Sequence, residues 1–167
     1  MRPEASTGSR AVGHLSDPTL RAWMAAQGFP PDDIEAVIEN RTTPLMQACR
    51  LGEDRIVDAL LAAGARLDAV NGDGNNALWL ACYCGDPAII DRLIGRGIAI
   101  DHQNDSGATC LMYAASSGKT AVVARLLEAG ADIRIRSQDD FTALDMAANL
   151  ECLQLLRAES RRRSSKT

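Results

Sequence analysis

The sequence predicts an all-α solenoid, in which helix-turn-helix units joined by β-hairpin-like loops stack along one axis. Three observations predict this fold. A set of residues recurs every 33 positions, and one such column is Leu45, Leu78, Leu111 and Leu144. Each recurrence follows a Thr or Asn suited to start a helix, and the first three precede a Gly suited to end one. Aromatic residues make up only 4% of the 167 residues, so the core must consist of small, closely spaced aliphatic contacts.

The chain opens with two segments that lie outside the 33-residue register. Residues 1–16 have no apolar periodicity and are expected to form a disordered tail without a secretion signal. Residues 17–40 are predicted to form a helical N-terminal cap. Asp17-Pro18 would open its first helix and Pro30-Pro31-Asp32 its second, because proline fits the first position of a helix.

The repeat domain is predicted to span residues 41–157, in four units of which the last is truncated. Each unit starts with a residue whose side chain can cap a helix: Thr43, Asn76, Thr109 and Thr142. A short first helix follows, with Ala48 on its buried face, and Gly52 ends it in the first unit. A second helix, apolar on one face, ends at Gly64. The approximate boundaries of the repeats are 38–70, 71–103, 104–136 and 137–157.

The loops between units are predicted to be tight hairpins. Residues 71–74 (NGDG) and 104–107 (NDSG) have the Asn and Gly content of hairpin turns. The fourth unit has no glycine turn after Ala147, so its second helix is expected to follow at once. Residues 158–167, which end in RRRSSKT, are predicted to be a basic, disordered C-terminal tail.

These units resemble the ankyrin repeats, a family whose unit is also 33 residues long. The family signature T-P-L-H-x-A has its counterpart in residues 43–48 (TPLMQA), and the G-A-D ending in residues 130–132. The resemblance covers residues 38–156. It implies a stack of helix pairs whose loops and first helices form a concave surface that binds another protein. It also implies that hydrogen bonds of the signature histidine between units are lost, since that column holds Met46, Trp79, Met112 and Asp145.

Composition argues against several classes of protein. No apolar run reaches the roughly 18 residues of a membrane span, so no membrane partner is expected. Apart from its arginine-rich end the chain is acidic, so nucleic acid is not an expected partner. Five cysteines without a secretion signal indicate reduced thiols and a cytoplasmic location. The excess of arginine over lysine is typical of a GC-rich bacterial genome.

No group of residues indicates catalysis, so the chain is not expected to be an enzyme or to hold a cofactor. Neither His14 nor His102 lies near a serine or cysteine motif that would mark a nucleophile with its base. Cys82, Cys84 and His102 could be considered a zinc site, but a fourth ligand is missing, and no metal site is expected. A thiol redox or metal protein that uses Cys82 and Cys84 remains an alternative function.

The main prediction is a monomeric protein-interaction module that binds a partner protein through the concave face. Four of the six aromatic residues lie in units two to four, and Tyr83 and Phe141 occupy positions that are variable and exposed in the family that the chain resembles. The predicted partner-binding residues are Asp73, Asn75, Trp79, Tyr83, Asp105, Tyr113, Ser116, Ser117 and Phe141. A second alternative is a translocated effector or regulator that acts through the basic C-terminal tail.

Overall fold

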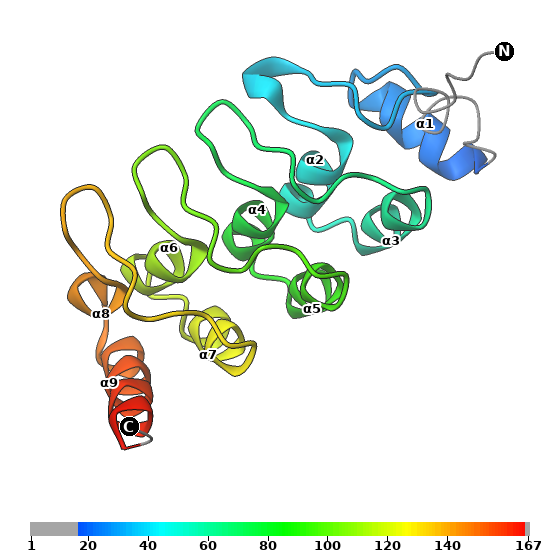
Figure 1. The fold of residues 1–167 in the computed structure, drawn as a ribbon. Coiled ribbons are helices and arrows are strands. Elements are labelled where there is room, and N and C mark those ends of the chain that lie inside the picture. The colour runs from blue at the N-terminus through cyan, green and yellow to red at the C-terminus, as the bar shows by residue number, and fades with distance from the viewer. Residues whose placement is uncertain (1–16, 166–167) are drawn as a thin grey trace, which may run out of the picture.

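The structure, a computed structural model, describes residues 17–165. Its helices form two rows, with α2, α4, α6 and α8 in an inner row and α3, α5, α7 and α9 in an outer row (Figure 1). The bounds are α1 Pro18–Ala26, η2 Glu39–Arg41, α2 Pro44–Leu51, α3 Asp54–Ala62, α4 Ala77–Cys84, α5 Pro87–Gly95, α6 Cys110–Ser116, α7 Thr120–Glu128, α8 Ala143–Met146 and α9 Leu150–Ser164. The predicted tail of residues 1–16, together with Lys166 and Thr167, lies outside the described residues.

The inner helices begin where their capping residues predict. In each case the side chain of the N-cap residue accepts a hydrogen bond from the backbone N–H three residues later: Thr43 from Met46, Asn76 from Trp79, Thr109 from Met112 and Thr142 from Asp145. Gly52 and Gly85 end α2 and α4 in the left-handed conformation. These local signals are sufficient to place the first helix of every unit.

The core runs continuously along the stack between the two rows. The predicted alanine column is fully buried at Ala48, Ala81 and Ala114, and the small side chains let neighbouring inner helices approach closely. In this arrangement α2 packs on α4, α4 on α6, and α6 on α8. The all-α solenoid predicted from the 33-residue period is therefore confirmed.

Other residues supply hydrogen bonds between units in place of the missing histidine. Nε2 of His102 lies 2.7 Å from the carbonyl oxygen of Gly74 in the preceding loop. Nδ2 of Asn149, at the start of α9, donates to the carbonyl oxygen of Gly118 over 3.1 Å. Nζ of Lys119 donates to the carbonyl oxygen of Tyr83 over 2.9 Å and so binds the exposed end of α4. Successive units are thus joined by polar contacts that the family signature does not include.

The outer helices are joined by ion pairs. Arg92 of α5 binds Asp54 of α3 over 2.7 Å and Asp58 over 3.0 Å. One unit later, Arg125 of α7 binds Asp91 of α5 over 3.0 Å. These pairs are partly exposed, so solvent and salt screen them and each contributes little to stability. On the outer surface of α3, α5 and α7, these aspartates are therefore paired with arginine.

The N-terminal cap contains one regular α-helix rather than the two that were predicted. Residues 30–38 form turns, in which the N–H of Asp33 bonds to Pro30 and the N–H of Ala36 bonds to Asp33. Bonds between residues three apart do not build a regular α-helix, and the side chain of Asp33 also accepts the N–H of Glu35. The segment instead carries the chain to the first hairpin loop and buries Ile34.

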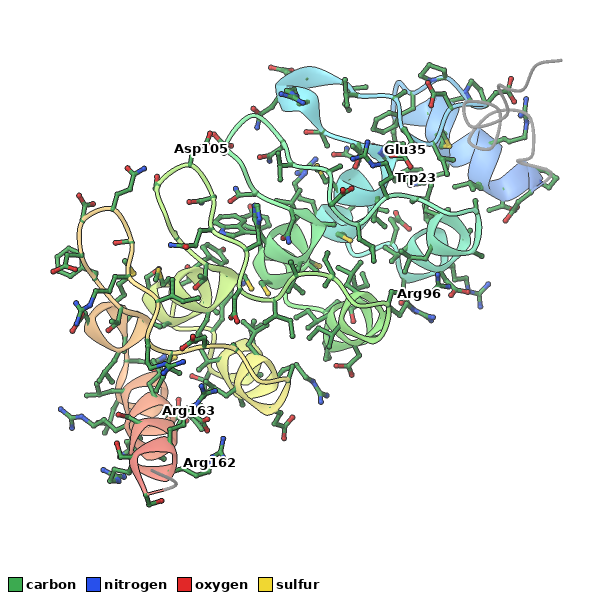
Figure 2. The ribbon with its side chains drawn as sticks, viewed as in Figure 1. Trp23, Glu35, Arg96, Asp105, Arg162 and Arg163 are labelled. Atoms are coloured by element: carbon green, nitrogen blue, oxygen red, sulfur yellow. The ribbon has the colours of Figure 1, made fainter. Side chains whose placement is uncertain are left out.

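The predicted disorder of the C-terminal tail is wrong from residue 158 to Ser164, because α9 continues to that residue. Glu159 is 8% exposed and accepts hydrogen bonds from Nε of Arg162 over 3.0 Å and Nε of Arg163 over 2.6 Å. Arg163 also donates to the carbonyl oxygen of Ala131 over 2.7 Å (Figure 2). The bonds to Glu159 lie within α9, and the bond from Arg163 to Ala131 joins the arginine-rich turns to the previous unit.

Candidate functional site

Four hairpin loops project from the inner row on one side of the molecule (Figure 1). Each loop is closed by a bond from the N–H of its first residue to the carbonyl oxygen of its fifth. The four bonds join Ile38 to Thr42, Asn71 to Asn75, Asn104 to Ala108 and Ser137 to Phe141, over 2.9–3.0 Å. We call these loops, residues 38–42, 71–75, 104–108 and 137–141, the fingers.

Backbone hydrogen bonds also join each finger to the next. Between the second and third fingers, the N–H of Asp105 donates to the carbonyl oxygen of Asp73 over 3.1 Å. The other two bonds, from Gly72 to Asn40 and from Gln138 to Ser106, are 2.9 and 3.0 Å long. The repeated bonds hold the fingers in one row, so their tips form a continuous edge rather than four independent loops.

Exposed large hydrophobic side chains gather beside this edge. In the described part of the chain they are Val37, Leu51, Tyr83, Phe141 and Leu150. Four of them lie on or next to a finger or at the end of an inner helix: Val37, Leu51, Tyr83 and Phe141. Tyr83 is in the last turn of α4, and Leu150 is the first residue of α9. We call the fingers and the exposed ends of α2, α4 and α6 the finger face.

Three rings form a row across the middle of the finger face. The ring centroids of Trp79 and Tyr113 are 4.2 Å apart, and those of Tyr83 and Tyr113 are 6.4 Å apart. Trp79 and Tyr113 are half-buried, whereas Tyr83 is 52% exposed. The indole N–H of Trp79 is buried without a hydrogen-bond partner. Tyr113, which packs on Trp79, therefore supports Tyr83, and Tyr83 presents its ring to solvent.

Most of the residues predicted to bind a partner lie on the finger face, but one does not fit the prediction. Asn75 is buried, and its side-chain oxygen accepts a 2.8 Å hydrogen bond from Nδ2 of Asn104 in the next finger. Its amide joins two fingers and is not available to a partner. Trp79 and Tyr113 are half-buried beneath Tyr83. The exposed members of the predicted set are Asp73, Tyr83, Asp105, Ser116, Ser117 and Phe141.

Sequence reasoning missed three exposed apolar residues, Val37, Leu51 and Leu150, of which Leu51 lies on the finger face and Val37 directly precedes the first finger. Leu51, Ser117 and Leu150 lie in one column of the 33-residue repeat, and Ser117 was already predicted to be exposed. Extending that column in both directions would have identified both leucines. Val37 had no such signal, because the segment that holds it was predicted to be helical.

Two of the buried thiols, Cys49 and Cys82, are not placed for reaction. Among residues 17–165, no three His, Cys, Asp or Glu side chains are arranged to hold a metal ion. Cys82 is fully buried, and a hydrogen bond with Cys110 together with burial raises the pKa of its thiol. Burial also raises the pKa of the Cys49 thiol. Since the thiolate is the reactive form, these positions do not favour redox chemistry.

The arginines of the predicted tail are in part already bound. Arg162 and Arg163 both hold Glu159, and their hydrogen bonds lower the pKa of that carboxyl to about 2. Arg161 is exposed on α9. A role for this segment in binding an acidic partner would therefore compete with ion pairs within α9 and with the bond from Arg163 to Ala131 of the previous unit. Between residues 17 and 165, the structure contains no helix of the length and apolarity that crossing a bilayer requires.

The comparisons agree with the geometry. Residues 11–104 and 78–164 match the family described as ankyrin repeats (3 copies). The matches include no catalytic family. A search of curated proteins finds no significant match. The matched segments together span more than half of the chain, and the paired helices and fingers are those of a repeat stack. The chain belongs to the ankyrin repeat family.

Proposed function

We propose that this chain is a non-catalytic interaction module that binds a partner protein through the finger face. Ankyrin repeats are generally protein–protein interaction modules. The observation that supports the finger face is the distribution of exposed apolar side chains. Tyr83 and Phe141 are about half exposed. Among the outer helices of the described chain, α3, α5 and α7 carry no large hydrophobic side chain exposed to that degree, and α9 carries one, Leu150 at its first residue. Exposed apolar groups that cluster on one side mark interaction surfaces.

The rigidity of the face supports the same proposal. The fingers are joined by backbone hydrogen bonds of 2.9–3.1 Å, and the row of three rings fixes the position of Tyr83. A surface that is already ordered loses little conformational entropy on binding. We further propose that the module acts as a monomer in a bacterial cytoplasm. The five cysteines, all free, support a reducing compartment.

The test is capture of partners from a native lysate by the full chain and by the double variant Tyr83→Ala/Phe141→Ala. Both side chains are exposed, so we expect the thermal midpoint to change little while capture is lost. Arg55→Ala is a matched control, because Arg55 is exposed on α3 in the outer row. We expect this control to capture the same proteins as the native chain. Unchanged capture by the double variant would contradict the proposal.

A further inference from the structure

The finger face carries an uneven charge pattern. Carboxylates lie at the tips of three consecutive fingers: Asp73, Asp105, Asp139 and Asp140. All four are exposed. Asp105 lies at the tip of its finger in Figure 2. Because backbone bonds join these fingers, the carboxylates form one acidic edge rather than separate surface charges.

Most of this charge has no cation beside it. Throughout residues 17–165, no lysine, arginine or histidine forms an ion pair with Asp73, Asp105 or Asp139. The side chain of Asp73 accepts a hydrogen bond from the neutral amide of Asn40, over 3.1 Å. Asp140 has a cation nearby, Arg136, at 3.6 Å. On the outer helices, by contrast, the aspartates at positions 54, 58 and 91 are paired with arginine.

Exposed aromatic rings lie on the same face as the unpaired carboxylates. Phe141 follows Asp139 in the fourth finger and is 50% exposed. Tyr83 lies in the last turn of α4, an inner helix of the finger face. Guanidinium and ammonium groups bind both carboxylates and the faces of aromatic rings, and their aliphatic stems pack on apolar surface. Acidic residues beside exposed rings therefore match a basic side chain better than a neutral or acidic one.

We propose that the partner presents a basic peptide segment, rich in arginine or lysine with interspersed aliphatic residues, to this face. Its cationic groups bind Asp105 and Asp139, and its apolar groups pack on Tyr83 and Phe141. The complementary charge also steers the encounter between the two proteins, so binding weakens as salt increases. The inference rests on the proposed function, and it adds the class of partner that the face selects.

The test is selection of random 12-residue peptides displayed on phage against the full chain. We expect the selected peptides to be enriched in arginine and lysine. We expect the double variant Asp105→Asn/Asp139→Asn to lose that enrichment and to bind a selected basic peptide at least tenfold more weakly. Glu53→Gln/Glu151→Gln is the control, since it removes the same charge from exposed positions outside the fingers and should leave both results unchanged.

Selection of neutral or acidic peptides, unchanged selection by Asp105→Asn/Asp139→Asn, or no selection at all would overturn the inference. A concentration-dependent dimer in sedimentation that the same variant abolishes would also overturn it, because the occupant would then be a second copy of the chain. These failures are separate from failure of the proposed function. If Tyr83→Ala/Phe141→Ala still prevents capture from lysate, the finger face remains the binding surface and only the basic partner is wrong.

Discussion

Replacing Gly107 with alanine tests whether the fingers act as one packed row. Gly107 lies in the third finger with a φ of +76°, and a Cβ built there would lie 2.8 Å from the backbone nitrogen of Gln138 in the fourth finger. That nitrogen donates the 3.0 Å hydrogen bond to Ser106 that joins the two fingers. The left-handed conformation costs alanine about 1–2 kcal/mol, and displacing the neighbouring backbone adds about 1–2 kcal/mol through the weakened hydrogen bond.

We therefore expect Gly107→Ala to lower the free energy of unfolding by about 2–4 kcal/mol, a large part of the 5–15 kcal/mol typical of a domain. Gly130→Ala is the matched control, because Gly130 has a φ of +94° but no atom within 4 Å of the added Cβ. The control should lose only the conformational part, about 1–2 kcal/mol. Urea unfolding followed by circular dichroism measures both values. Equal losses in the two variants would refute packing between the fingers.

Three further predictions concern the C-terminal helix, a helix cap and the thiols. The pKa of Glu159 is lowered to about 2 in the folded chain from an ordinary 4.5, so its stabilisation is present above pH 4.5 and is lost as the pH falls toward 2. Glu159→Gln should lower stability at pH 7 by about 1–2 kcal/mol and flatten the acid limb of a stability–pH curve; an unchanged curve would contradict this. Thr109→Ala should cost about 1–2 kcal/mol in urea unfolding, because the cap of α6 is buried, while Thr109→Ser should retain most of the stability. Cys84, which is half-buried, should react with a thiol reagent before the four buried cysteines, and simultaneous reaction of all five would show that the core opens readily.

The inner helices could be predicted from sequence because their signals are local. Thr43 and Gly52 bracket α2 through a side-chain cap and a left-handed turn, and both lie within a few residues of the helix that they define. Because capping residues recur every 33 positions, the same assignment applies to the first helices of the later units. The fold class follows from the same signals, since short helices with one apolar face must stack to bury that face.

The errors occurred where distant contacts decide the structure. Pro30 and Pro31 have the residue types of a helix start, but the chain there turns into the first finger. The arginine-rich end lacks an apolar period, and its helix depends on Glu159 and on the carbonyl oxygen of Ala131 in the preceding unit. Asn75 is a polar loop residue, and only its hydrogen bond with Asn104 in the next finger shows that it is buried.

The central claim is that the finger face is the surface that meets the partner. The most direct test is hydrogen–deuterium exchange of the full chain, alone and in complex with a captured partner. Protection on binding should appear in the fingers and at the exposed ends of α4 and α6, around Tyr83 and Phe141. Protection confined to the outer helices α3, α5 and α7, with the fingers unchanged, would contradict the claim.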